Sequence, residues 1–300
     1  MTEFDEELRR CAADVEAALD RLLTAPALSG PGEAPQRVVA AMRHGALGGG
    51  KRLRPLLVRQ AAAIFGVPAE ATLLAGVAVE MVHCYSLVHD DLPAMDDDDL
   101  RRGRPTVHKA FDEATAILAG DALLTHAFGV LATPAAHPDP AIRARLVSEL
   151  VAAAGAGGMV GGQMRDIEGE TSPLPDAEIA DMQAMKTGAL IRAAVRMGAI
   201  LGGAPEEALA TLTRFAGLAG RAFQLADDLL DATSTEAALG KAVGKDAAAG
   251  KQTLIARLGL DAARRELGEL VHDALTALME FGPEADGLRA TARFFAAREN

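Results

Sequence analysis

Two clusters of aspartates set into apolar stretches constrain this chain more than any other feature. The first lies in HDDLPAMDDDDLRRG at 89–103, and the second lies in FQLADDLLD at 223–231. Carboxylates crowded beside Val, Leu and Ala repel one another and lose hydration, so bound divalent cations are the natural compensation. Because these segments offer carboxylates without a cysteine cluster or a paired-histidine spacing, they favour Mg²⁺ over Zn²⁺.

Helical spacing places further polar side chains beside the two clusters. The second cluster has four polar residues at positions i, i+3, i+4 and i+7, which lie in one stripe along a helix: Gln224, Asp227, Asp228 and Asp231. The first cluster follows an apolar run that contains three polar residues at positions i, i+3 and i+7: His83, Ser86 and Asp90. Pro93 disturbs the helix soon afterwards. We therefore expect two inward-facing acidic stripes that oppose each other.

Composition favours helices over strands. Hydrophobic residues make up 50% of the 300 residues but aromatics only 3%, while Ala and Leu abound. We predict an all-α protein with one large domain over 1–300, because no linker-like segment divides the chain. Four stretches rich in Pro or Gly are the expected connections, at 133–140, 171–176, 202–207 and 238–251.

Charge and sorting signals exclude several classes of protein. The formal net charge of −12 argues against a nucleic-acid-binding surface. The N-terminal segment has no signal-peptide core, and Arg192 and Arg196 interrupt an apolar stretch, so we expect a cytoplasmic protein without membrane insertion. Cys11 and Cys84 are expected to be reduced thiols. The glycines at 155–163 indicate close helix packing rather than a nucleotide loop, since no strand precedes them.

Basic groups that could receive phosphate accompany the acidic clusters. GGGKRLRP at 48–55 places cations after three glycines, where a flexible backbone can wrap an anion. The others are Arg101 with Arg102, Lys186 with Thr187, and the loop lysines Lys241, Lys245 and Lys251. Arg offers forked contacts and Lys a mobile charge, so the set could bind two diphosphates, one through Mg²⁺ and one through basic residues alone.

Taken together, these segments resemble the trans-isoprenyl diphosphate synthases of the polyprenyl synthetase family, and specifically the short-chain bacterial farnesyl diphosphate synthases. The blocks that carry the resemblance occur in the family's order: GGGKRLRP, HCYSLVHDDLPAMDDDDLRRGRPTVHKAF, GGQMRDIEGE, MKTGALIRAAVRMGA, FQLADDLLD and LGKAVGKDAAAGKQT. An isolated aspartate pair is often only a solvated face, but this ordered combination is specific.

The resemblance implies an isoprenoid synthase-type helical bundle around a deep central cavity, in a homodimer, with three Mg²⁺ per active site or Mn²⁺ as an alternative. It assigns metal binding to Asp90, Asp91, Asp96, Asp227 and Asp231. It assigns the allylic diphosphate to Arg101, Lys186, Thr187, Gln224, Lys241 and Lys245. It assigns isopentenyl diphosphate to Lys51, Arg54, His83 and Arg102. The implied catalytic residues are Asp90, Asp91, Asp96, Asp227, Lys186 and Lys241.

Several neighbouring residues also have plainer roles. For His89, which points about 100° around the helix from Asp90, a structural hydrogen bond is at least as good an interpretation. Three further aspartates of the first cluster are interpreted mainly as salt-bridged or solvated side chains rather than metal ligands: Asp97, Asp98 and Asp99. For Gln163 and Asp166, a packing or supporting role is favoured over direct chemistry.

Control of the length of the isoprenoid product is assigned to Tyr85 and the small Ser86. Tyr85 precedes Asp90 by five residues, or about 7.5 Å along a helix, where an isoprenoid tail would descend from the diphosphate. An aromatic ring there, with the Pro93–Ala94 insertion, resembles enzymes that stop at farnesyl diphosphate; a geranylgeranyl diphosphate synthase is the alternative.

Two other classes of protein are alternatives. A terpene cyclase would not need the second diphosphate site. A non-catalytic regulatory subunit of a heteromeric prenyltransferase could lose ligands that this chain retains.

Overall fold

The computed structural model describes residues 2–172, 175–233 and 259–297. Within these ranges the regular structure is almost entirely helical. The strands there form one antiparallel hairpin, in which β1 (Leu100–Arg101) pairs with β2 (Arg104–Pro105). The predicted all-α fold is therefore confirmed. Three of the four expected connections lie between helices, and the fourth, 238–251, lies outside the described residues.

The chain divides into two compact units. The first comprises Met1–Arg59 and Pro68–Val147, and the second comprises Gln60–Val67 and Ser148–Asn300. The single domain over 1–300 stays a prediction.

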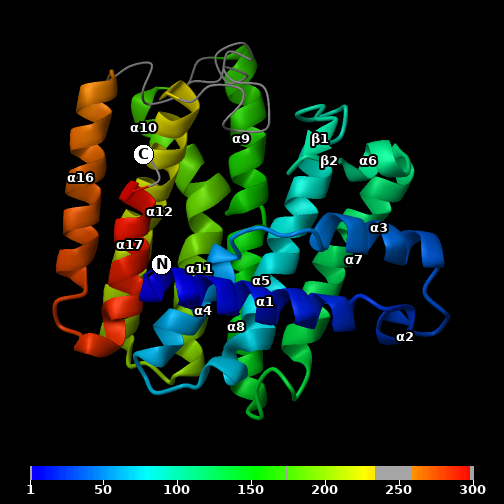
Figure 1. Cartoon of the computed structure of the whole chain (residues 1–300), viewed down its shortest axis with the longest axis horizontal. Coiled ribbons are helices and arrows are strands. Elements are labelled where there is room, and N and C mark those ends of the chain that lie inside the picture. Colours follow the sequence, from blue (N-terminus) through cyan, green and yellow to red (C-terminus); the bar gives the residue numbers. More distant parts are fainter. Residues whose placement is uncertain (1, 173–174, 234–258, 298–300) are drawn as a thin grey trace. The chain divides into compact units, whose positions relative to one another are not determined.

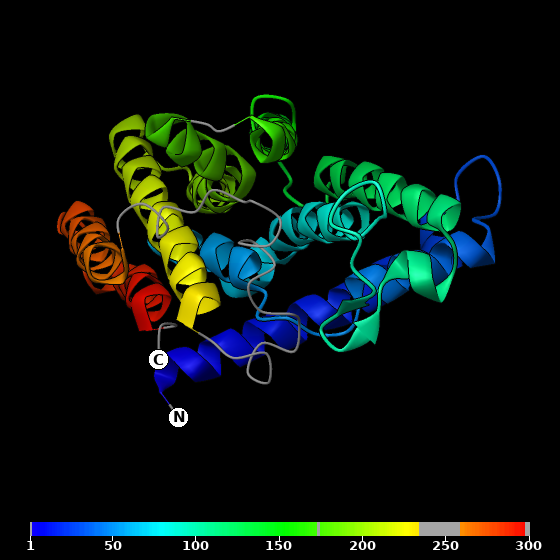
Figure 2. The ribbon, with the colours of Figure 1, turned by 90° about the horizontal axis from the view of Figure 1, so that it is seen from above.

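The first unit is built around α5 (Ala69–Asp90) and α7 (Glu113–Ala132), which run side by side (Figure 1). In Figure 2, α5 lies between α7 and α1 (Glu3–Leu22). The other helices with residues in this unit are α2 (Ala25–Leu28), α3 (Gln36–Ala46), α4 (Leu53–Ala63), α6 (Val107–Ala110) and α8 (Pro140–Ala154), of which α4 and α8 continue into the second unit.

Helix α5 is a core helix because its sequence is apolar on every side. All positions from 75 to 82 are buried, including the carboxyl-bearing Glu80. By length and composition α5 and α7 could each cross a membrane, but this is weak evidence, since a buried core helix passes the same test and most of α5 is buried.

A glycine lets α5 and α7 approach each other. A Cβ atom at Gly120 would lie 2.1 Å from Nε2 of His89, so the imidazole occupies the space that a side chain would need. The same nitrogen lies 3.0 Å from the main-chain oxygen of Ile117 and donates to it, because a carbonyl can only accept. The predicted structural hydrogen bond of His89 is therefore present.

The second unit contains the longest described helix, α12 (Glu206–Thr233), and α16 (Leu260–Ala277), which pack against each other. The buried part of their contact is apolar and includes Leu225 and Leu229 from α12 and Leu267 from α16. The remaining elements that begin in this unit are α9 (Met159–Thr171), α10 (Asp176–Gln183), the π-helical turn η1 (Ala184–Gly188), α11 (Ala189–Leu201), the 3₁₀ turn η2 (Pro283–Ala285) and α17 (Asp286–Ala297).

Two further sequence predictions concern local packing, and both are confirmed. A Cβ atom at Gly162 in α9 would lie 2.2 Å from the main-chain nitrogen of Lys186 in η1, so the glycine-rich segment serves close packing. Cys11 and Cys84 are free and buried. Burial raises the pKa of both thiols to about 11, so both stay protonated at neutral pH.

Candidate active site

The first acidic segment begins where α5 ends, at Asp90, and folds back over the end of the helix. The main-chain nitrogen of Asp96 donates to the oxygen of Asp90 at 2.8 Å, and that of Asp98 donates to the oxygen of Asp91 at 3.2 Å. The turn therefore returns Asp96 to the last residue of α5. Carboxylates here add to the negative end of the helix dipole, so a cation bound at this turn would be stabilised by both.

Asp91 is paired with a guanidinium. Its side chain is 3% exposed and accepts a forked contact from Arg101, with Nε and Nη2 at 2.8 and 2.6 Å from Oδ1. Burial raises the pKa of Asp91, although the hydrogen bonds and charge of Arg101 oppose the shift. The family resemblance assigns Asp91 to metal and Arg101 to diphosphate, whereas the structure joins these two groups to each other.

A cluster of positive charge surrounds His83 in the first unit. Burial and the charges of Arg54 and Arg102 hold the pKa of His83 well below its usual value, so its imidazole is neutral at neutral pH. Arg102 also donates to the main-chain oxygen of Gly49. Three of the residues predicted to bind isopentenyl diphosphate are thus brought together, and the fourth, Lys51, is exposed in the adjoining loop.

The loop that carries Lys51 has a buried anchor. Gly48, Gly49 and Gly50 all have positive φ angles (134°, 89° and 120°), which other residues rarely adopt. Arg52 follows them with a side chain that is 0% exposed, and it pairs with Glu80 at 2.8 Å and with Glu16 at 2.6 Å. Arg52 therefore holds the loop in place, which leaves phosphate binding in this segment to its neighbours.

The predicted chain-length residues lie on α5 as expected. Tyr85 is 5% exposed and packs edge-on against His89, with ring centroids 5.7 Å apart. Burial, with a smaller effect from the charge of Asp90, raises the pKa of the phenol to about 12. The hydroxyl of Ser86 donates to the main-chain oxygen of His83 at 2.9 Å.

The second acidic segment lies on α12 in the second unit. Its aspartates differ in environment: Asp227 is exposed, Asp231 is half-buried and Asp228 is buried. Asp228 accepts from Nε2 of Gln224 at 2.9 Å and from Nε2 of Gln183 at 3.1 Å. The predicted helix is correct, but the four polar residues do not share one environment, because the two glutamine amides satisfy Asp228 inside the unit.

Lys186 and Thr187 lie in η1, a single π-helical turn between α10 and α11. Such turns are rare and occur often at functional sites. The Nζ atom of Lys186 lies 2.5 Å from Oδ2 of Asp166 on α9. Asp166 thus supports a predicted substrate residue, in keeping with the role that the sequence favoured. Lys241 and Lys245, predicted to bind the same diphosphate, lie outside the described residues.

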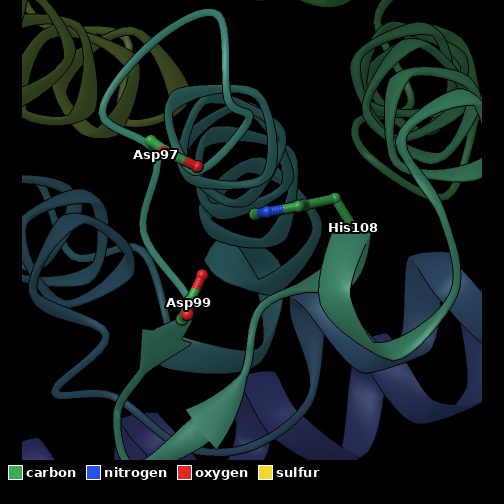
Figure 3. A group of neighbouring side chains, drawn as sticks. All are labelled: Asp97, Asp99 and His108. Atoms are coloured by element: carbon green, nitrogen blue, oxygen red, sulfur yellow. The ribbon is translucent and has the colours of Figure 1, made fainter.

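Among the described residues, one group of side chains converges in the manner of a metal site, and it contains none of the five predicted metal ligands. The group is Asp97, Asp99 and His108, all in the first unit (Figure 3). Sequence reasoning missed His108 because it lies nine residues beyond Asp99, across the hairpin. Its only signal was its place in the PTVHK segment of the second family block.

Comparisons with known proteins identify the class to which this helical fold, with its acidic and basic segments, belongs. The polyprenyl synthetase family model matches residues 35–280. The farnesyl diphosphate synthase of Escherichia coli (strain K12) is 45% identical over 287 residues, which is 94% of each chain. A chloroplastic geranylgeranyl pyrophosphate synthase of Catharanthus roseus is 42% identical over 270 residues, covering 89% of this chain and 75% of that protein.

A solved structure supports the same family assignment. The crystal structure of an FPP/GFPP synthase from Zymomonas mobilis in its apo form is 43% identical, with a TM-score of 0.85 and 98% coverage of both chains. This chain belongs to the polyprenyl synthetase family.

Proposed function

We propose that this chain is a prenyltransferase that condenses isopentenyl diphosphate head-to-tail with dimethylallyl or geranyl diphosphate, yielding farnesyl diphosphate and pyrophosphate. The observation that carries the proposal is the 45% identity to the Escherichia coli farnesyl diphosphate synthase over 94% of both chains. The acidic turn after α5 and the positive cluster around His83 support it, because two anionic substrates need two kinds of binding group.

The residues proposed to hold Mg²⁺ are Asp90, Asp91, Asp96, Asp227 and Asp231. They suit a hard cation, since they offer oxygen ligands, and the turn that returns Asp96 to Asp90 gathers carboxylates at the negative end of a helix. The family resemblance supports three ions, with Mn²⁺ as an alternative. When bound, the ions would neutralise the diphosphate and so make it a better leaving group. Asp91 can join this set only if Arg101 shares or releases its carboxylate.

The residues proposed to contact the allylic diphosphate are Arg101, Lys186, Thr187, Gln224, Lys241 and Lys245. Three of these already donate to a carboxylate: Arg101 to Asp91, Lys186 to Asp166 and Gln224 to Asp228. Such pairing fixes a long side chain in one position before substrate arrives, which favours electrostatic stabilisation of the leaving group as its charge develops. Isopentenyl diphosphate would bind Lys51, Arg54, His83 and Arg102, so that its double bond attacks the allylic carbocation.

The test is to incubate the purified chain with Mg²⁺, isopentenyl diphosphate and either dimethylallyl or geranyl diphosphate, and to measure product chain lengths by mass spectrometry. We expect a dominant C15 product. Conversion of the allylic substrate alone would instead indicate a terpene cyclase. Binding of both substrates without condensation would indicate a subunit that depends on a partner.

Replacing Tyr85 by alanine should lengthen the product from C15 to C20 or beyond, as measured by the same assay. The ring is buried on α5 beside His89, and its removal opens space along the proposed path of the isoprenoid tail. Tyr85→Phe is the matched control, since it keeps the ring and should keep the C15 product. An unchanged product distribution in Tyr85→Ala would refute the assignment of this ring as the group that limits product length.

A geranylgeranyl diphosphate synthase is the second candidate. The 42% identity to the geranylgeranyl pyrophosphate synthase of Catharanthus roseus favours it, whereas the buried aromatic ring at Tyr85 favours the shorter product. A dominant C20 product from the unaltered chain would decide for this candidate and would keep the prenyltransferase chemistry.

We also propose a cytoplasmic homodimer. The exposed apolar side chains of Ile117 and Leu118 on α7, which are 45% and 58% exposed, support a protein contact on this helix. Light scattering of the purified chain should give twice the mass of one chain, and a monomer mass would contradict the dimer.

A further inference from the structure

We propose that Asp97, Asp99 and His108 form a binding site for a divalent first-row transition-metal ion, separate from the aspartates proposed above to hold Mg²⁺. The proposal rests on the geometry of the first unit and does not depend on the enzymatic activity.

The three side chains converge from two sides of the hairpin. Asp97 and Asp99 precede β1, while His108 follows β2 as the second residue of α6. Their ligand atoms all lie within 4.8 Å of one another. Figure 3 shows the imidazole of His108 pointing between the two carboxylates. The arrangement therefore offers one nitrogen and two carboxylates to a single point.

The buried nitrogen of His108 is what distinguishes this group from a solvated acidic cluster. The residue is 7% exposed, and its Nε2 atom is buried without a hydrogen-bond partner. A buried polar atom in that state costs free energy that a ligand would recover. The tip of the imidazole, where Nε2 lies, points between the two carboxylates in Figure 3, so a cation is the ligand that suits all three groups.

Hydrogen bonding determines which nitrogen carries the proton. The hydroxyl of Thr106 donates to the main-chain oxygen of Asp98 at 2.8 Å, and that uses its single hydrogen. Its contact of 3.1 Å with Nδ1 of His108 must then be accepted from Nδ1–H. With the proton on Nδ1, the lone pair of the imidazole lies on Nε2, at the tip of the ring that points between Asp97 and Asp99 in Figure 3. A metal-binding histidine commonly has its other nitrogen held in this way.

The main chain holds the carboxylates where the histidine needs them. Asp97 has a φ of 48°, in the left-handed region, and its nitrogen donates to the oxygen of Leu92 at 3.2 Å. The main-chain nitrogen of Thr106 donates to the oxygen of Asp99 at 3.0 Å, which continues the hairpin ladder beyond β1 and β2. The site is thus part of an ordered turn and hairpin.

The ligand set selects the class of metal. Mg²⁺ prefers oxygen alone, whereas imidazole nitrogen shifts preference toward ions such as Co²⁺, Fe²⁺ and Zn²⁺. One protein cation competes for the site, because Nζ of Lys109 lies 2.9 Å from Oδ1 of Asp99. Removing that ammonium should strengthen metal binding, while removing a ligand should weaken it. These opposite directions separate metal binding from a general loss of structure.

The experiment is a titration of the purified full chain with Co²⁺ in a large excess of Mg²⁺, without substrates, followed by calorimetry and by proton NMR of the Co²⁺-bound protein. We expect one Co²⁺ per chain that Mg²⁺ does not displace. The spectrum should show one strongly shifted imidazole N–H signal, from Nδ1 of His108, that disappears in D₂O.

Four variants complete the test. His108→Gln should abolish the shifted signal and weaken Co²⁺ binding by more than about tenfold. Asp97→Asn should weaken it similarly with the backbone preserved, since Asn tolerates a positive φ. Lys109→Gln should tighten binding several-fold. His272→Gln, an exposed histidine on α16, should change nothing. No retained Co²⁺, or a shifted signal that persists in His108→Gln, would overturn the proposal.

Discussion

Replacing Asp90 or Asp227 by alanine should lower turnover by about a thousandfold or more, with little change in the helical fold. Each carboxylate is proposed to hold Mg²⁺, and losing a metal contact removes several kcal/mol of stabilisation of the leaving group, roughly tenfold in rate for each 1.4 kcal/mol. Neither side chain belongs to the core, since Asp90 is half-buried and Asp227 is exposed. Steady-state turnover of isopentenyl diphosphate and far-ultraviolet circular dichroism measure the two effects.

The control for this pair is Asp273→Ala, which removes an exposed aspartate from α16. It should leave both turnover and helicity unchanged. Near-normal turnover in Asp90→Ala or Asp227→Ala would contradict the assignment of the metal ligands.

Replacing Arg52 by methionine should lower the free energy of unfolding by about 3–5 kcal/mol. The guanidinium is fully buried and pairs with Glu80, whose side chain is 3% exposed. Removing the cation leaves the carboxylate of Glu80 buried without its ion pair, and this penalty exceeds the worth of the contact itself. Urea denaturation followed by circular dichroism measures the change.

Two further variants separate the buried charge from a general effect of arginine loss. Arg221→Met breaks an ion pair with Glu266 in which the arginine side chain is 52% exposed, and it should cost less than about 1 kcal/mol. Combining Arg52→Met with Glu80→Met should recover part of the lost stability, because the buried carboxylate that Arg52 had paired is then removed as well. Equal losses from Arg52→Met and Arg221→Met would show that burial of the pair is unimportant.

Arg52 also shows what residue types alone do not predict, namely whether a cation faces substrate or is buried in an ion pair. In the sequence it is one of three cations after a glycine run and looks as suitable for phosphate as Lys51 or Arg54. The structure turns it inward to Glu16 and Glu80. Both acidic partners lie on helices, α1 and α5, that are 36 and 28 residues away in the chain, and no local pattern identifies them.

For the carboxylates, too, the sequence predicts some features and not others. Sequence spacing correctly predicts that α5 ends at the first aspartate pair and that the second cluster lies on a helix, since both depend on residues within a few positions of each other. It does not predict that Asp91 pairs with Arg101 or that Asp228 is satisfied by Gln183 and Gln224. Those pairings depend on turns and helix contacts that bring distant residues together.

The sequence by itself determined the helical class, the acidic and basic chemistry and the order of the family blocks, because composition, helical periodicity and motif order are written along the chain. Only the tertiary structure decided which carboxylate each cation meets and that His108 reaches Asp97 and Asp99. The physical reason is that the burial and partners of these charged groups depend on the turn after α5 and on the β1–β2 hairpin. The contacts within the turn and the hairpin follow no helical spacing.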